Sequence, residues 1–205
     1  MTDQPEVLTI GHSAHTIEHF VALLRRHGVT AIADVRSQPS SRYAPQFNRT
    51  EFAASLRQAD IQYVFLGHEL GARSNDPDCY VDGRIQYARL AQTDTFRAGL
   101  ARVVNGAQNE RIALMCTEKD PLDCHRTVLV ARRLADEGVR ISHILADGSI
   151  ESDGEAIDRL MCQLGMQPSL FCSRQEQVDE ALAEQEARIA YVNADQAALS
   201  ERVVS

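Results

Sequence analysis

The sequence predicts an α/β protein with a mostly parallel central sheet of about five strands, helices on both faces and an appended C-terminal helix. Short apolar runs rich in β-branched residues alternate along the chain with longer segments whose apolar residues recur at helical spacing. Such alternation places successive strands parallel, with a helix packed between them. The 205 residues, of which 44% are hydrophobic, suffice for one domain with a sizeable core.

The expected strands are short apolar runs, and most of them lead into polar residues. They cover residues 7–10, 30–35, 61–65, 111–116 and 139–145. Closure of the same units into a barrel is the alternative arrangement, but a complete barrel of this kind needs eight strands. An open sheet is therefore the favoured interpretation.

Capping residues mark several helices between these strands. Thr16 is suited to cap a helix that stops at Gly28, and Thr50 to cap one that runs to Ala59. Further helices are expected over residues 84–90, 95–104, 124–137 and 150–164.

One α/β domain is expected over residues 7–166, followed by a C-terminal extension over residues 167–205. The composition changes after Pro168, and residues 175–190 are rich in Glu, Gln and Ala. The apolar residues of this last segment fall on one helical face. We therefore expect a helix that packs on the domain or on a partner, and an oligomer could form through it.

Composition excludes several classes of protein. A formal net charge of −8 argues against non-specific nucleic-acid binding, which needs a positive surface. No apolar run approaches the roughly 20 residues that span a bilayer, and the polar start of the sequence lacks a secretory signal, so a cytoplasmic protein is expected. The five widely spaced cysteines do not suggest a disulfide framework. They are buried small residues, metal ligands or catalytic thiols.

Four of the expected strands end in polar residues. Ligands of parallel α/β sheets bind beyond the carboxyl ends of the strands, so these residues should meet at one edge of the sheet. In chain order they are His12 and Ser13, Asp34 and Arg36, His68 and Glu69, and Cys116, Thr117 and Glu118.

One loop between a strand and a helix holds the most chemistry. Pro121 keeps the loop out of a helix, and Asp123 is suited to cap the helix that follows. Cys124, His125 and Arg126 would then lie in the first turn, where unpaired N–H groups and the helix dipole bind anions. The same position lowers a thiol pKa, so we expect Cys124 to be able to form a thiolate.

Three functional interpretations of this loop are open. Cys116 or Cys124 is a nucleophile, with His125 as base and Glu118 or Asp34 as proton carrier. The two cysteines form a reversible disulfide. Or the cysteines and His125, with His12 as a further ligand, bind a metal, although the spacing C-x7-C-H is not that of a zinc finger. The structural alternative is that both thiols are simply buried.

Residues 34–48 supply a second group of candidates. Asp34 at a buried strand end needs a partner, and Arg36 or Arg42 can pair with it. The two arginines could instead grip a phosphate or carboxylate in a bidentate manner. Asn48 follows on the same segment and could line a pocket.

Several short motifs occur in order along the chain. They are TIGHS at residues 9–13, DVR at 34–36, FN at 47–48, LG at 66–67 and 70–71, MC-x-E at 115–118 and CHR at 124–126. Together they resemble the bacterial family called domain of unknown function 488, over residues 8–148. The resemblance implies that the paired cysteines, His125 and Arg126 belong to the family's motif. It implies no reaction, and Ala72 stands where the family typically has a second glycine.

A more distant similarity is to rhodanese-like proteins and low-molecular-weight phosphatases. They also place a cysteine at a strand end, before an anion-binding loop, an arginine and a helix. Here the loop over residues 117–121 is acidic and lacks their glycine-containing cradle. Glu118 and Asp120 would repel a phosphate unless they are protonated or paired. The sequence therefore assigns neither phosphatase nor sulfurtransferase activity.

The leading hypothesis is an enzyme with a thiol-containing, anion-binding site for a small phosphate-bearing or nucleotide-like substrate. The alternatives are a non-enzymatic module that binds a ligand or a protein partner, with structural or redox-sensing cysteines, and a metal site at the Cys/His cluster. The sequence indicates no particular cofactor. The candidate catalytic residues are Cys116, Glu118, Cys124, His125, His12 and Asp34, and the candidate substrate-binding residues are Arg36, Arg42, Arg126, Ser13 and Asn48.

Overall fold

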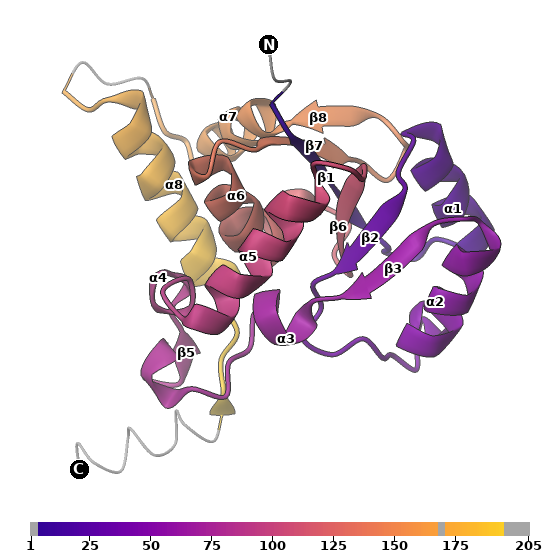
Figure 1. Cartoon of the computed structure of the whole chain (residues 1–205). Helices are drawn as coiled ribbons and strands as arrows, with labels where there is room; N and C mark the ends of the chain where they lie inside the picture. The colour runs from indigo at the N-terminus through magenta and orange to yellow at the C-terminus, as the bar shows by residue number, and fades with distance from the viewer. Residues whose placement is uncertain (1–3, 168–170, 195–205) are drawn as a thin grey trace.

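The computed structural model describes residues 4–167 and 171–194, and it contains a six-stranded sheet in the order β3-β2-β6-β1-β7-β8 (Figure 1). The first five strands in this order are parallel, and β8 runs antiparallel to β7 at one edge. The predicted α/β class with a mostly parallel sheet is therefore confirmed. The strands are β1 (Glu6–Gly11), β2 (Ala31–Asp34), β3 (Gln62–Phe65), β6 (Ile112–Cys116), β7 (Arg140–Ile144) and β8 (Ile150–Ser152).

Helices cover both faces of this sheet, as Figure 1 shows. Alternate strand residues point to opposite faces, so Leu8 and Ile10 join one core and Val7 joins the other. Both cores are apolar, which is why the central strands are hydrophobic along almost their whole length. The helices are α1 (Ile17–Arg26) and α2 (Arg49–Gln58) on the first face, and α5 (Asp94–Gly106), α6 (Arg132–Asp136), α7 (Asp153–Gln163) and α8 (Arg174–Ile189) on the second.

The order of the strands explains why the helices divide in this way. The chain first steps outward from β1 to β2 and β3, and then returns to insert β6 between β1 and β2. Right-handed crossovers in opposite directions put their helices on opposite faces. The insertion also brings the carboxyl ends of β1, β2 and β6 together, which is where parallel α/β sheets bind ligands.

A small hairpin replaces the first part of the helix expected over residues 84–90. It consists of β4 (Tyr80–Val81) and β5 (Arg84–Ile85), and the helix α4 (Tyr87–Leu90) is shorter than predicted. Asp82 and Gly83, with φ of 48° and 74°, form the turn between the strands. The prediction failed because Asp-Gly, which favours such turns, outweighs the helical tendency of its neighbours.

The helix expected over residues 150–164 also begins later than predicted. Gly148, with φ of 80°, turns the chain back along β7, and residues 150–152 pair with it as β8. The helix α7 starts after Ser152, whose side chain accepts a hydrogen bond from the Glu155 N–H, while the Glu155 carboxylate accepts one from the Ser152 N–H. This capping box sets the true start of the helix.

The expected C-terminal helix is present as α8. Its buried residues, Val178, Ala181 and Leu182, belong to the core that includes α7, so the domain covers its apolar face. An oligomer formed through α8 stays a prediction. Residues 168–170 and 195–205 of the predicted extension lie outside the described residues. Among the described residues, no helix is both long and apolar enough to cross a membrane.

The core under α1 and α2 contains an aromatic cluster that allows a test of the fold. Phe52 is completely buried and lies edge-to-face with Phe20 and Phe47 at centroid distances of 5.7 and 5.4 Å. We expect Phe52→Ala to lower the free energy of unfolding by about 3–5 kcal/mol, because it leaves a cavity. Urea unfolding measures this. Tyr43→Ala is the control, since Tyr43 is 81% exposed, and a change below about 0.5 kcal/mol is expected there.

Candidate functional site

The ends of three strands are joined at the site by backbone hydrogen bonds. The His12 N–H donates to the Cys116 carbonyl (2.9 Å), and the Ser13 N–H donates to the Thr117 carbonyl (2.9 Å). On the other side of β6, the Val35 N–H donates to the Met115 carbonyl (3.1 Å). The three loops therefore leave the sheet side by side. The fourth predicted strand end, that of β3, lies next to β2 at the same edge, but His68 and Glu69 line a different cavity from the cysteines.

Gly11, the last residue of β1, makes room for the loop that follows β6. A side-chain Cβ at Gly11 would lie 1.8 Å from the backbone oxygen of Glu118, which is far inside contact distance. Only glycine allows this approach. The Glu118 backbone oxygen then accepts a hydrogen bond from Nη1 of Arg126 (2.8 Å). The end of β1, the loop after β6 and the helical segment that begins at Arg126 are thus in contact at the Glu118 backbone oxygen.

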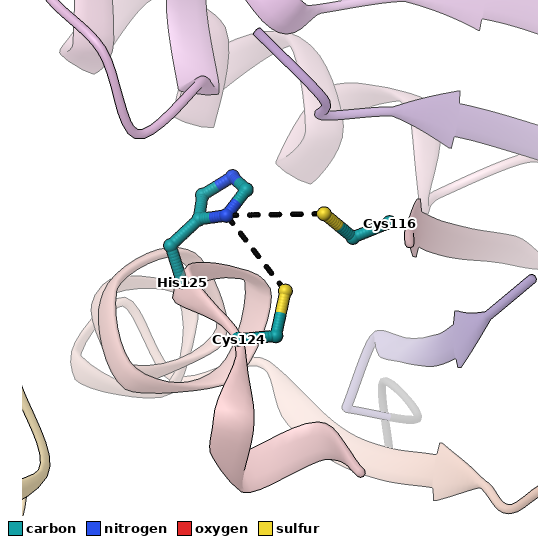
Figure 2. A group of neighbouring side chains, drawn as sticks. All are labelled: Cys116, Cys124 and His125. Carbon is teal, nitrogen blue, oxygen red and sulfur yellow. Dashed lines mark hydrogen bonds between the residues drawn. The ribbon is translucent and has the colours of Figure 1, made fainter. Parts of the chain in front are cut away.

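Two buried thiols and one imidazole lie at the centre of the site (Figure 2). Nδ1 of His125 lies 3.7 Å from the Cys124 sulfur and 3.9 Å from the Cys116 sulfur. The other ring nitrogen, Nε2, lies 3.0 Å from the backbone oxygen of Val35. A carbonyl can only accept, so Nε2 carries a hydrogen, and Nδ1 is the atom that faces both sulfurs.

The turn before Cys124 differs from the prediction. Asp123 does not cap a helix. Instead Asp120 accepts a hydrogen bond from the Leu122 N–H (2.9 Å) and starts a 3-10 turn over Pro121–Asp123. Cys124 itself is extended, and a π-helical segment, Arg126–Ala131, precedes α6. The prediction failed because Asp120 precedes a proline, which favours a short separate turn.

The expected anion-stabilising environment of Cys124 is nevertheless present. The Arg126 N–H donates to the Cys124 sulfur (3.4 Å), and the Cys124 carbonyl accepts hydrogen bonds from the Thr127 and Val128 N–H groups (3.1 and 3.2 Å). Cys124 therefore lies two residues before the helical segment, whose capping residue is His125, and not in its first turn as predicted. Backbone N–H groups at such a position favour a negative sulfur.

The charge states in the cluster follow from its burial and its internal contacts. Burial opposes ionisation of Cys124, but the hydrogen bond from Cys116 and the charges of Arg126 and His125 hold the pKa of the Cys124 thiol well below its usual value. The hydrogen bond to Cys124 and burial raise the pKa of the Cys116 thiol well above its usual value. Burial is the largest single influence on the pKa of His125 and lowers it, but the Cys124 sulfur, Glu118 and the hydrogen bond to Val35 together raise it above its usual value. These directions favour a negative Cys124 sulfur and a positive His125 ring beside a Cys116 thiol that keeps its proton.

Glu118 is the acidic group nearest the cluster. Burial is the main cause that raises its pKa, and the negative Cys124 sulfur is the next. One of its carboxyl oxygens, Oε2, is buried and has no hydrogen-bond partner within the described residues. A carboxyl group in this environment keeps its proton to a higher pH than a free carboxyl group does, as a general acid requires.

Asp34 and Arg36 form a buried ion pair at the end of β2. Nε of Arg36 donates to Oδ1 of Asp34 (2.9 Å), and Nη2 donates to Oδ2 (2.7 Å). The Tyr63 hydroxyl also donates to Oδ2 (2.8 Å), and Nη2 of Arg36 reaches the Phe47 carbonyl (2.8 Å). The sequence left open whether Arg36 pairs with Asp34 or binds an anion, and the structure shows the ion pair with Asp34. Arg36 also lines the cavity beside the cysteines.

The side chain of His12 lies against this ion pair. Its ring stacks on Phe47 at a centroid distance of 4.3 Å, and Nδ1 donates to the Ser13 carbonyl (3.0 Å). Nε2 faces Nη1 of Arg36 at 3.4 Å. Burial and the positive charge of Arg36 lower the pKa of His12 from 6.5 to about 4, so the ring is neutral at pH 7.

A cavity of about 310 Å³ opens beside the cluster and contains five of the eleven candidate residues. Those five are Arg36, Cys116, Glu118, Cys124 and His125. The other six do not line it. Arg42 donates to the Tyr43 hydroxyl (2.6 Å), and Asn48 accepts a hydrogen bond from the Ser41 N–H (2.7 Å). Ser13 has a φ of 47°, Arg126 is buried, and His12 and Asp34 lie beside Arg36. Their proposed roles stay predictions.

The completely buried side chain of Arg126 has more hydrogen-bond donors than partners. Its Nη1 is bonded to Glu118, but Nε and Nη2 have no hydrogen-bond partner in the described part of the chain. A buried guanidinium that lacks partners is costly. It keeps a positive charge next to Cys124, which favours an anion at this end of the cavity.

Several cavity residues were not among the sequence candidates. They are Ser37, Gln38, Ser40, Ala72, Arg73, Tyr87, Thr117, Asp123, Ile189 and Tyr191. Neighbours of known candidates, such as Thr117 and Asp123, could have been found by proximity along the chain. Ile189 and Tyr191 come from the far end of α8 and the residues after it, and no local pattern marks them.

The cluster can also be tested as a metal site. The sulfurs of Cys116 and Cys124 and a ring nitrogen of His125 all lie within 4.8 Å of one another. Zn–S and Zn–N bonds of about 2.3 and 2.1 Å at tetrahedral angles place S and N roughly 3.6 Å apart, close to the observed 3.7 and 3.9 Å. The Val35 carbonyl orients the imidazole as second contacts of metal-bound histidines do. These residues fit a soft divalent ion.

Comparison with known proteins agrees with the motifs. A family model described as "Domain of unknown function DUF488" matches residues 16–133, more than half of the chain. The chain belongs to the DUF488 family. The predicted family is thus confirmed, although the TIGHS motif precedes the matched residues.

Solved structures add only distant likenesses to this DUF488 chain. Two crystal structures of a candidate phosphatase (DUF442) from Shewanella putrefaciens CN-32 have TM-scores of 0.40 and 0.41 at 11% and 10% identity. They cover 91% and 93% of this chain, which in turn covers 90% of each. Likeness at this level carries no conclusion about activity. No curated protein matches the chain.

The approach of the β6 loop to β1 predicts that Gly11 cannot be replaced. Gly11→Ala must push the Glu118 backbone away from the 1.8 Å contact, so we expect a loss of about 3 kcal/mol or more in the free energy of unfolding. Gly154→Ala is the matched control, because its Cβ would meet nothing within 4 Å. That helical glycine should tolerate alanine or gain up to about 1 kcal/mol. Equal stability of both variants would contradict this account of Gly11.

The lowered pKa of His12 predicts a dependence of stability on pH. Between pH 6.5 and about 4 the unfolded chain binds a proton at His12 and the folded chain does not. The contribution of His12 to the free energy of unfolding is therefore fully present above pH 6.5. It falls by about 3 kcal/mol in total as the pH drops. We expect His12→Gln to show a flatter fall than the wild type in urea unfolding series. Parallel curves for the two proteins would refute the assignment.

Proposed function

We propose that this DUF488 chain is an enzyme that acts on a small phosphate-bearing substrate, with the Cys124 sulfur as nucleophile. The observation that carries the proposal is the position of that sulfur. It borders the cavity and is surrounded by the Arg126 N–H, the Cys116 thiol and Nδ1 of His125. Three donors around one sulfur stabilise the thiolate form, which is the nucleophilic form.

The charge around the cavity supports an anionic substrate. Arg36, Arg73 and His125 line it, and the buried guanidinium of Arg126 lies behind the cysteines. Two features weaken the repulsion that the acidic loop would exert on a phosphate. Burial raises the pKa of the Glu118 carboxyl, and Asp120 is bonded by both terminal nitrogens of Arg159 (2.8 and 3.1 Å). Asp123 also lines the cavity, and the arginines and His125 outnumber it.

In the proposed reaction the Cys124 sulfur attacks the phosphorus atom of a phosphate ester. An S–P bond forms while the bond from phosphorus to the leaving oxygen breaks, and Glu118 gives its proton to that oxygen. A water molecule then attacks the S-phosphoryl group, and the Glu118 carboxylate takes one of its protons. Inorganic phosphate leaves, and both the Cys124 thiolate and the protonated Glu118 are restored.

The nucleophile can be tested by alkylation of the folded, reduced protein. At pH 6 we expect iodoacetamide to modify Cys124 at least about tenfold faster than the exposed Cys162, because the thiolate persists at low pH. Peptide mass spectrometry measures both rates in one sample. His125→Gln removes the imidazolium and should slow modification of Cys124 at pH 6 while leaving that of Cys162 unchanged. A Cys124 that reacts only after unfolding would exclude the role.

Catalysis needs a separate test from thiol reactivity. Hydrolysis of p-nitrophenyl phosphate should be lost in Cys124→Ser, with an unchanged circular dichroism spectrum and a cooperative thermal unfolding transition as evidence of an intact fold. The rival hypothesis is a non-enzymatic module, with a ligand or a protein as partner. It requires that the wild type binds phosphate in this cavity without turnover of phosphate esters.

A second candidate is a metal centre, and the separations of 3.7 and 3.9 Å in the cluster favour it. On this proposal Cys116, Cys124 and His125 hold zinc, with a fourth position open toward the cavity. Protein purified without chelator should then contain about one zinc per chain, measured by plasma mass spectrometry. His125→Gln should lower that content strongly. If metal-free protein hydrolyses phosphate esters, the result supports the Cys124 thiolate as nucleophile and contradicts the metal centre.

A further inference from the structure

The lining of the cavity beside the cysteines combines charged and apolar groups. Cys124, His125 and Arg36 supply the charged and nucleophilic groups. Ala72, Tyr87, Ile189 and Tyr191, called the apolar wall below, supply aliphatic groups and two aromatic rings. The volume of about 310 Å³ corresponds to roughly ten water molecules at about 30 Å³ each. A single phosphate group would leave most of it empty.

Part of the apolar wall comes from residues outside those that the family model matches. The match ends at residue 133, whereas Ile189 is the last residue of α8 and Tyr191 follows it. In Figure 1 the chain leaves the lower end of the yellow helix α8 and passes beside β5. The lining of the site is therefore completed by residues that lie outside the part of the chain that the family model matches.

Two polar contacts hold the end of α8 against the site. The buried Gln185 donates from Nε2 to the Leu122 carbonyl (3.0 Å), in the turn just before Cys124. The Glu186 carboxylate accepts a hydrogen bond from the Tyr87 N–H (2.7 Å). Tyr87 is itself a cavity residue. The position of α8 is thus tied both to the nucleophile loop and to the apolar wall.

The residues after α8 are held by backbone pairing with the small hairpin. The Ile85 N–H donates to the Tyr191 carbonyl (3.0 Å), and the Asn193 N–H donates to the Gly83 carbonyl (2.7 Å). Arg84 and Val192 form the antiparallel bridge between these two contacts. The guanidinium of Arg73 lies 4.3 Å from the centre of the Tyr191 ring, which restrains the side chain as well. Tyr191 is therefore a fixed part of the cavity.

We propose that the substrate is an organic phosphate with an aromatic or similarly flat apolar group, and that Tyr191 is the residue that selects it. The phosphate lies at the wall with Cys124, His125 and Arg36. The flat group lies against Tyr87, Ile189 and Tyr191, where it replaces water on apolar surface. The inference rests on the site of the proposed function, but it concerns binding only and requires no reaction.

The test compares two ligands on the full-length Cys124→Ser protein, in which the nucleophile is absent. Isothermal titration calorimetry should show phenyl phosphate binding roughly tenfold more tightly than inorganic phosphate. Adding Tyr191→Ala should reduce that ratio to about threefold or less, with little change for inorganic phosphate. Adding Tyr191→Phe, which keeps the ring, should retain the ratio.

Val192→Ala is the matched control on the same segment. Its side chain is 45% exposed and does not line the cavity, so the ratio should not change. Equal affinities for the two ligands would overturn the proposal. So would a Tyr191→Ala variant that weakens both ligands alike, because the residue would then support the fold and not the flat group.

The calorimetric result is independent of the nucleophile. If the wild type does not hydrolyse p-nitrophenyl phosphate but the preference for phenyl phosphate depends on Tyr191, the proposed function fails and the selectivity of the site stands. If hydrolysis is found without the preference, the selectivity fails alone.

Discussion

The site depends on one steric constraint, the passage of the β6 loop directly over the backbone of Gly11. This contact aims the Glu118 carbonyl at Arg126 and thereby fixes the start of the following helical segment. With that start fixed, the Cys124 sulfur faces the end of β6, where Cys116 is. Insertion of β6 between β1 and β2 then adds Arg36 from the neighbouring strand end. A methyl group at Gly11 would disturb all of these positions together.

Burial makes the charges of the cluster interdependent. A thiolate, an imidazolium and a guanidinium out of water are each unfavourable alone, and they are tolerated because they compensate one another. Well-packed apolar residues of similar volume would serve stability as well or better. The arrangement of Cys124, His125 and Arg126 therefore makes sense as a device for chemistry or binding, with the surrounding cores supplying the stability that it costs.

Features that depend on neighbours in sequence or on the general rules of parallel sheets could be predicted. His12, Asp34 and Cys116 were expected near one another because strand ends of a parallel sheet share an edge. The hairpin at Asp82 and β8 were missed because two- and three-residue strands carry too little pattern to outweigh neighbouring helical signals. The cavity wall at Tyr191 could not be predicted, since long-range pairing with Ile85 places it there.

The residues of α8 and Tyr191 come late in the sequence, and this has a consequence for biosynthesis. A chain emerging from the ribosome presents residues 112–126, and with them both thiols, well before α8 and Tyr191 are available. Until the extension docks, the nascent chain lacks Ile189 and Tyr191, which line the cavity in the finished protein. Truncation by a premature stop codon after α7 would leave these residues out permanently. The lining of the site is therefore completed only at the end of synthesis.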